Sequence, residues 1–177
     1  MLVIAGCTCS GKTTIVNELM KCGFHKLVTT TTRPMRSGET QDVDYHFISD
    51  EEFKQKSDDG YFAEYKLYHA KDGDWYYGTA ISDIENVDNK TVVILTPEGV
   101  RDIKKIQEDI FVIYIYVNNQ TIEKRLLCRG DNKDEAKRRI LADRIDFRGF
   151  ELEVDKIVYN NDDVKIDNVV NRILTLV

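Results

Sequence analysis

The sequence predicts an α/β protein built on a parallel sheet with helices on both faces. An apolar run rich in β-branched residues, Leu2 to Ala5, leads through a glycine-containing loop into a segment with apolar residues at helical spacing. Further along the chain, strand-like and helical segments alternate, which is typical of a parallel sheet. The interior strand-like segments are apolar at consecutive positions, as expected where both faces of a strand are buried. These observations favour a three-layer α/β/α core.

Local signals place the elements of the first half. The helix after the loop is expected to start near Thr13 and to end at Cys22 and Gly23, because glycine terminates helices. Ser49, three residues before Glu52, is typical of a capping box that starts a helix, and Gly60 ends that helix. We expect strands at 2–5, 25–30, 45–48, 61–68 and 75–78, a loop at 31–39 and a turn at 71–74.

The second half alternates more regularly. Pro97 stands at a first helical position, where its missing N–H breaks no hydrogen bond. Ile122, Leu126 and Leu127 are expected to share the buried face of their helix. We expect strands at 91–95, 110–117 and 157–159, helices at 97–107, 120–128, 133–147 and 166–177, and a polar break at 130–132. Residues 33–80 interrupt the alternation and are expected to form an inserted, mostly β lobe.

The composition indicates one domain without a general affinity for polyanions. The chain has 177 residues, 42% of them hydrophobic and 32% charged, which suffices for one substantial core. A net charge of −6 argues against nucleic acid or an anionic membrane as a partner. No apolar run approaches the roughly 20 residues of a spanning helix, and the apolar start lacks the basic leader of a signal peptide. We expect a cytoplasmic protein, monomeric or homodimeric.

The cysteines do not have the spacing of a zinc module; they are Cys7, Cys9, Cys22 and Cys128. Reduced thiols in the cytoplasm are the simplest interpretation. Because Cys7 and Cys9 lie in the glycine loop, two alternatives stay open. They are inert loop thiols, or they are acidified by neighbouring backbone N–H groups and therefore redox-sensitive.

The glycine loop predicts a polyphosphate site. Gly6 to Thr13 fits the pattern G-x-x-x-x-G-K-[ST] between a strand and a helix, which is the context in which the pattern binds phosphate. Backbone N–H groups and the helix N-terminus would face the phosphates, Lys12 would reach the β- and γ-phosphates, and the Thr13 hydroxyl would complete a Mg²⁺ shell. The residues expected to contact the polyphosphate, which the resemblance described below identifies as ATP, are Gly6, Cys7, Thr8, Cys9, Ser10, Gly11, Lys12, Thr13 and Thr14.

Two clusters in the inserted lobe suggest a second ligand. Arg33 and Arg36, with Tyr45 nearby, suit a small phosphate monoester, although two solvated loop arginines would have the same sequence. Glu64 can accept from N1–H and the 2-amino group of guanine, and Thr79 can donate to O6. The alternative is that Glu64 is an ordinary surface carboxylate.

A third cluster consists of arginines on two consecutive helices. Arg125 and Arg129 are four residues apart and share a helix face. Further arginines follow on the next predicted helix, at Arg138, Arg139 and Arg144. An arginine-rich lid suits phosphoryl transfer, because charge spreads over the migrating group and water must be excluded. A solvated helix face is the alternative, supported by interspersed acids such as Asp143 and Asp146.

Together these motifs resemble the guanylate kinase family over essentially the whole chain. The matching stretches, in the order of the family, are Gly6–Thr13, Thr31–Arg33, Arg36–Glu39, Asp44–Tyr45, Phe62–Glu64, Tyr76–Thr79, Arg125–Gly130 and Val158–Asp163. The resemblance implies a P-loop kinase with three parts that close on ATP and GMP. These are a core (1–32, 81–128 and 148–177), a nucleoside-monophosphate lobe (33–80) and a lid (129–147).

The resemblance also implies roles for single residues. The GMP phosphate would be held by Thr29, Arg33, Arg36, Tyr45 and Tyr77, and guanine would be recognised by Glu64 and Thr79. The transferring group would be stabilised by Lys12, Arg36, Arg125, Arg129 and Arg139, with Asn160 near the far end of the site. The reaction implied is ATP + GMP ⇌ ADP + GDP with Mg²⁺, dGMP being a further acceptor.

Three departures from the family pattern leave alternatives open. In the family an Asp-x-Asp stretch helps position GMP, the loop lysine and Mg²⁺. Ile94 to Gly99 lacks both of these acids, and Glu98 is a possible substitute. The segment 68–75 is about four residues longer than usual. The lid is one residue short, so the role of Arg139 can fall to Arg138. The alternatives are a kinase of another nucleoside monophosphate or small phosphate ester, and a guanylate-kinase-like binding module without catalysis.

Overall fold

The computed structural model describes residues 1–70, 73–130 and 133–177. The expected turn residues Lys71 and Asp72, and Asp131 and Asn132 of the expected polar break, lie outside this range. The described chain forms two compact units. The core unit consists of residues 1–26, 89–100 and 110–177, and the inserted unit of residues 27–88 and 101–109.

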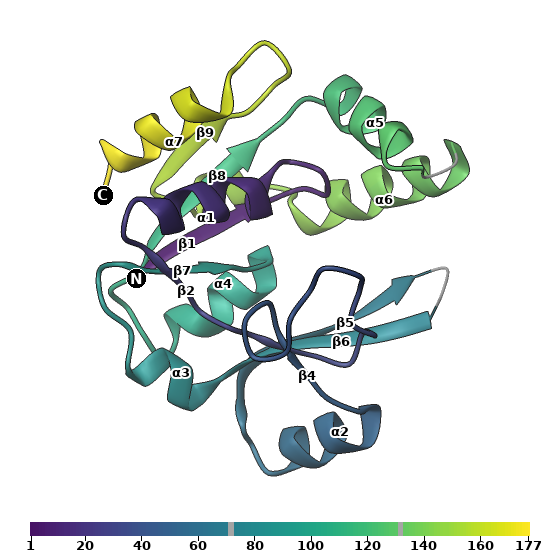
Figure 1. Ribbon diagram of the computed structural model, residues 1–177, viewed down its shortest axis with the longest axis vertical. Helices are drawn as coiled ribbons and strands as arrows, with labels where there is room; N and C mark the ends of the chain where they lie inside the picture. The colour runs from purple at the N-terminus through teal and green to yellow at the C-terminus, as the bar shows by residue number, and fades with distance from the viewer. Residues whose placement is uncertain (71–72, 131–132) are drawn as a thin grey trace. The chain divides into compact units, whose positions relative to one another are not determined.

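The core unit contains the predicted parallel sheet (Figure 1). Every strand pairs in parallel with its neighbour, and β1 lies between β7 and β8. The strands in spatial order are β2 (His25–Lys26), β7 (Thr91–Ile94), β1 (Leu2–Gly6), β8 (Phe111–Tyr116) and β9 (Lys156–Tyr159). All five residues of β1 are buried, which explains its unbroken apolar sequence.

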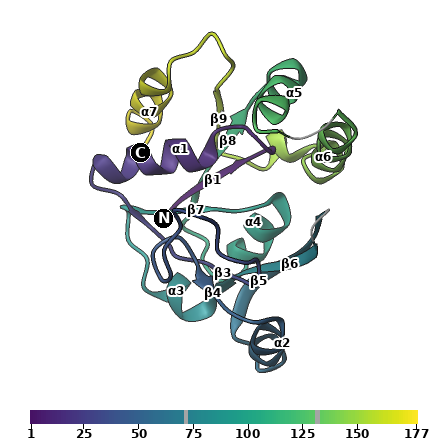
Figure 2. The same cartoon turned by 45° about the vertical axis from the view of Figure 1, so that its right-hand side comes forward.

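Helices cover both faces of this sheet. On one face α1 (Lys12–Lys21) and α7 (Ile166–Leu174) lie side by side and pack with the sheet into one apolar cluster (Figures 1 and 2). Ile113 and Ile115 of β8 point into this cluster, whereas the alternate residue Tyr114 faces the other side. There it stacks on Phe147, which directly follows α6 (Lys133–Asp146). Two further elements of this unit are α5 (Asn119–Cys128) and the 3₁₀ helix η1 (Phe150–Leu152).

The inserted unit has its own sheet. An antiparallel hairpin of β5 (Phe62–Ala70) and β6 (Gly73–Ala80) is extended by two short strands, β3 (Thr30–Thr31) and β4 (His46–Phe47). Phe53 of α2 (Asp50–Asp58) is buried against this sheet and stacks on Phe62 and Tyr76 at ring-centroid distances of 4.3 and 4.9 Å. Ser49 is the N-cap of α2, as predicted, because its hydroxyl accepts from the N–H of Glu52 at 3.1 Å. The short α3 (Ile81–Glu85) follows β6.

Several boundaries differ from the sequence-based expectation. The single strand expected at 25–30 is wrong: β2 pairs with β7 in the core unit and β3 with β6 in the inserted unit. The helix that starts at Pro97, α4 (Pro97–Lys104), is shorter than expected, because Lys105 and Ile106 bond back three residues in turns. Leu127 is 39% exposed, while Ile122 and Leu126 are buried as predicted. The short helices α3 and η1 were not predicted from the sequence.

Candidate active site

The phosphate loop connects β1 to α1 in the core unit, as the motif predicts. Gly11 has φ 90°, and a Cβ there would lie 2.5 Å from the side-chain nitrogen of Asn160. That nitrogen donates to the carbonyl of Ser10 at 2.8 Å and so fixes the loop from the end of β9. At Gly6 a Cβ would lie 2.8 Å from the carbonyl oxygen of Ile115. Neighbouring atoms therefore leave no room for a Cβ at either glycine, and at Gly11 the left-handed backbone also favours glycine.

Lys12 is held by the loop itself. Its Nζ donates to the carbonyl oxygens of Gly6 and Cys7 at 2.7 and 2.9 Å. Burial lowers the pKa of Lys12, and the negative charge of Asp143 is the largest influence in the opposite direction. The two residues that follow, Thr13 and Thr14, are exposed in the first turn of α1.

Two predicted arginines are in contact with the loop. Arg125 of α5 donates to the carbonyl oxygens of Cys9 and Asn160 at 3.1 and 2.9 Å and pairs with Asp162 at 3.2 Å. Arg129, one turn later, donates to the sulfur of Cys9 at 3.3 Å. The structure thus brings both arginines and Asn160 to the loop. On α6, Arg138 is exposed and Arg139 is half-buried.

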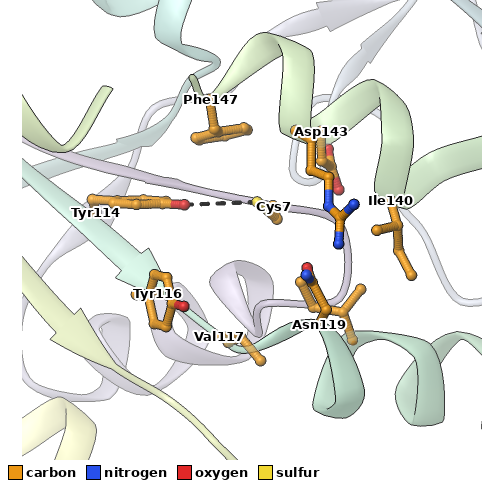
Figure 3. Close-up of a pocket in the computed structure, with 10 residues that line it drawn as sticks. Cys7, Tyr114, Tyr116, Val117, Asn119, Ile140, Asp143 and Phe147 are labelled. Carbon is orange, nitrogen blue, oxygen red and sulfur yellow. Dashed lines mark hydrogen bonds between the residues drawn. The ribbon is translucent and has the colours of Figure 1, made fainter. Parts of the chain in front are cut away.

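A cavity of about 200 Å³ opens beside the loop in the core unit (Figure 3). Cys7, Tyr114 of β8 and Asp143 of α6 line it, and the Cys7 sulfur lies 3.8 Å from the Tyr114 hydroxyl. Burial raises the pKa of the Cys7 thiol to about 11 and also raises the pKa of Tyr114. The raised pKa favours the inert alternative for Cys7, because burial and the charge of Asp143 both disfavour the thiolate.

Asp143 was expected on a solvated helix face, and its position in the structure is different. It is half-buried, and its Oδ2 accepts from the backbone N–H of Thr8 in the phosphate loop at 2.8 Å. Because Asp143 stands among arginines on a polar helix, its sequence surroundings did not indicate a contact with the phosphate loop. Its i, i+4 neighbour Phe147, which packs on Tyr114, marks the face of the helix that turns inward.

In the inserted unit, Arg33 is buried rather than solvated, with 7% of its surface exposed. Its Nη2 donates to both carboxylate oxygens of Glu39 at 2.7 and 3.0 Å, and its Nε to the Tyr77 hydroxyl at 3.1 Å. Glu39 also accepts from the backbone N–H of Arg36 at 2.8 Å, while the Arg36 side chain points to solvent. Glu39 therefore organises this loop, a role the sequence reasoning missed although the residue lies in a quoted motif.

Aromatic residues complete the surroundings of Arg33. The rings of Tyr45 and Tyr77 meet edge to face at 5.8 Å, and the Arg33 guanidinium lies 5.6 Å from the Tyr45 ring centre. Burial raises the pKa of Tyr45, so its hydroxyl is a neutral donor. Thr29 lies at the start of this region, and its carbonyl accepts from the N–H of His46 at 2.9 Å. Three of the five predicted phosphate-binding residues are thus in contact with one another.

The two residues expected to recognise the base also lie together. Glu64 of β5 and Thr79 of β6 are paired across the hairpin, beside a register shift between Phe62 and Glu64. The buried Thr79 hydroxyl donates to Glu64 Oε1 at 2.5 Å. A carboxylate and a hydroxyl are therefore presented side by side, and because the hydroxyl proton is directed at Glu64 here, it must turn away from the carboxylate to donate to another acceptor.

The stretch that lacks the two acids of the family pattern, Ile94 to Gly99, makes other contacts in this structure. The Thr96 hydroxyl accepts from the N–H of Gly99 at 3.1 Å and so caps α4, and Glu98 is exposed in the first turn. Within the described part of the chain, no group of three or more His, Cys, Asp or Glu side chains is placed to hold a metal ion. The same residues include no helix long and apolar enough to cross a membrane.

Comparisons with known proteins bear on the family and on the fold. Residues 1–176 match the family model described as guanylate kinase. A guanylate kinase of Sulfurimonas denitrificans is 34% identical over 79% of this chain and 70% of that protein, and one of Fusobacterium nucleatum is 27% identical over 100% and 95%. The crystal structure of guanylate kinase from Anaplasma phagocytophilum aligns with a TM-score of 0.72 at 20% identity, over 99% of this chain and 82% of that one. This last likeness confirms the predicted fold class.

Proposed function

The chain belongs to the guanylate kinase family, and from this premise we propose that it transfers the γ-phosphoryl group of ATP to GMP or dGMP. The predicted enzyme class, an ATP-dependent nucleoside monophosphate kinase, follows from that membership. The observation that carries the proposal for GMP is the placement of the Glu64 carboxylate beside the Thr79 hydroxyl in the inserted unit, where the carboxylate can accept from the guanine edge and the hydroxyl can rotate to donate to O6. Adenine presents the opposite pattern of donors and acceptors at the matching edge, so this pair favours guanine.

On the donor side, residues of the core unit would bind the triphosphate. Backbone N–H groups from Cys7 to Thr14 and the positive end of α1 would hold its oxygens, with Lys12 at the β- and γ-phosphates. Arg125 and Arg129 already contact the loop through Cys9, which supports their role in stabilising charge on the transferring group, together with Arg139.

Thr13 is the residue that fits Mg²⁺. Its exposed hydroxyl directly follows Lys12, and Mg²⁺ prefers oxygen ligands, which the phosphates and water would complete. When bound, the metal ion would neutralise charge on the β- and γ-oxygens.

On the acceptor side, residues of the inserted unit would fix the GMP phosphate. Arg36 is exposed, Arg33 is oriented by Glu39 and Tyr77, and Tyr45 offers a neutral hydroxyl. Thr29 is proposed to join them. The acceptor is an ionised phosphate, so the reaction needs no general base, and the contribution of these residues is positioning.

We further propose that residues 33–80 serve as the nucleoside-monophosphate lobe and residues 129–147 as the lid, with the rest of the chain as the core. A monomer or homodimer in the cytoplasm, without nucleic-acid or membrane partners, fits a net charge of −6 and four free thiols.

A second candidate is a kinase of another monophosphate, and one observation favours it. The position where the resemblance implies an acid for GMP and Mg²⁺ is occupied by Thr96, whose hydroxyl caps α4 instead. A binding module without catalysis is disfavoured by the complete loop with Lys12 and Thr13.

The decisive experiment is a coupled assay of ADP release against a panel of acceptors. The panel contains GMP, dGMP, AMP, CMP, UMP and a sugar phosphate at matched concentrations. We expect GMP and dGMP to give the highest kcat/KM. Equal rates across the panel would favour the second candidate, and ATP binding in calorimetry without turnover on any acceptor would favour the binding module.

A further inference from the structure

One carboxylate lies in direct contact with the phosphate loop. Asp143 of α6 accepts a hydrogen bond from the backbone N–H of Thr8 at 2.8 Å, across 135 positions of the chain. Backbone N–H groups of such a loop converge on one concavity and there bind phosphate oxygens. A carboxylate oxygen of the protein therefore occupies a donor that the loop otherwise offers to a bound anion.

The groups around Asp143 determine how strongly its negative charge is held at the loop. Lys12 of the loop attracts the carboxylate, and the neighbouring Cys7 and Tyr114 are kept neutral by burial. On its own helix, Asp146 repels it, and Arg144 lines the same cavity. Burial raises the pKa of Asp143, against the hydrogen bond from Thr8 and the charge of Lys12. The carboxylate thus lies where its charge attracts Lys12 within the loop.

We propose that Asp143 is a built-in anion that the donor polyphosphate must displace from the phosphate loop, so that this residue sets the affinity of the loop for phosphate. The inference rests on the proposed function in one respect, namely that the loop binds the phosphates of the donor. Two anions do not share one N–H group and one lysine without strong repulsion in a partly buried site. Displacement also breaks the hydrogen bond that joins α6 to Thr8 of the loop.

Calorimetric titration with tripolyphosphate tests this directly, because the probe carries the phosphate chain without the base. Asp143→Ala removes both the charge and the acceptor, and Asp143→Asn removes the charge alone. Asp134→Asn is the matched control, since Asp134 is exposed on the same helix. We expect about tenfold tighter binding in Asp143→Ala, a smaller gain in Asp143→Asn and no change in the control.

A pH series separates displacement from a mere change of loop shape. Protonation of Asp143 removes the competing charge, and burial raises its pKa above the usual aspartate value of 3.8, so the ratio of wild-type to Asp143→Ala affinity should approach one as the pH falls through that raised pKa. Protonation of the probe affects both proteins equally. Unchanged or weaker binding in Asp143→Ala, or a ratio independent of pH, overturns the inference. If neither protein binds tripolyphosphate, the loop is not a polyphosphate site, and the proposed function fails as well.

Discussion

Replacing Glu39 by Gln should weaken both the inserted unit and its use of GMP. Glu39 receives three hydrogen bonds at 2.7, 3.0 and 2.8 Å, two from the Arg33 guanidinium and one from the backbone of Arg36. The pair is largely shielded from water, with side-chain exposures of 8% for Arg33 and 20% for Glu39. Gln keeps one acceptor oxygen, removes the charge and presents an N–H₂ group to a cation.

The magnitude follows from the burial of the pair. Exposed ion pairs contribute about 0.2–1 kcal/mol, whereas breaking a buried pair costs about 3–5 kcal/mol. Because the Arg33–Glu39 pair lies between these limits and Gln retains one hydrogen bond, we expect a loss of about 2 kcal/mol in unfolding free energy. Since Arg33 is proposed to hold the GMP phosphate, KM for GMP should rise by a larger factor than kcat falls.

Urea denaturation followed by the fluorescence of Trp75 provides the assay, because this single tryptophan lies in β6 of the inserted unit. Glu85→Gln, at an exposed residue of the same unit, is the control and should stay within about 0.5 kcal/mol of wild type. The Arg33 hydrogen bond holds the pKa of Glu39 below its usual value of 4.5, although burial acts in the other direction. The stabilisation is therefore present above that pH and is lost as the pH falls through the folded-state pKa, so wild type and variant should converge in acid. Equal stability of the two proteins at pH 7 would refute the reasoning.

Three further substitutions test the site. Lys12→Ala should lower kcat by orders of magnitude while circular dichroism shows an intact fold, and near-normal turnover would contradict the assigned role. Glu64→Gln should raise KM for GMP about tenfold while KM for ATP stays unchanged, as measured in the coupled assay, and an equal effect on both nucleotides would argue against base recognition. Gly11→Ala should lower ATP affinity in calorimetry and cost about 1–2 kcal/mol from its left-handed backbone, plus the clash of its Cβ with Asn160. Gly130→Ala is the control, because it has a similar φ and an open surrounding, and equal losses in both would show that the clash is unimportant.

The core of the fold could be predicted because its signals are local. The apolar run from Leu2, the loop glycines and the Ser49 cap each act within a few residues of sequence, and all three stand as predicted. The strand expected at 25–30 failed for a non-local reason. His25 and Lys26 pair with β7, while Thr30 and Thr31 pair with β6, and only those partners show that the segment divides between two sheets.

The candidate site was predictable only as a set of residue types. Motif order identified Arg33, Glu64 and Thr79, but whether Arg33 is solvated or buried depends on Glu39 and Tyr77, whose contact with it is set by tertiary packing. For Asp143 the residue type itself was misleading. An acid among arginines is typical of an exposed helix face, and its contact with Thr8 requires α6 to lie against the loop.

The charge balance of the loop connects the unexpected position of Asp143 with the missing acids of the family pattern. A partly buried lysine such as Lys12 needs a counter-charge, and the family resemblance implies acids at the end of the central strand. In this chain Ile94 and Thr96 stand there and carry no charge, and the Thr96 hydroxyl is committed to capping α4. The negative charge acting most strongly on Lys12 comes instead from Asp143 on α6. The electrostatics of the phosphate loop are therefore coupled to the position of α6, because moving Asp143 away from the loop would remove a charge that opposes the effect of burial on the pKa of Lys12.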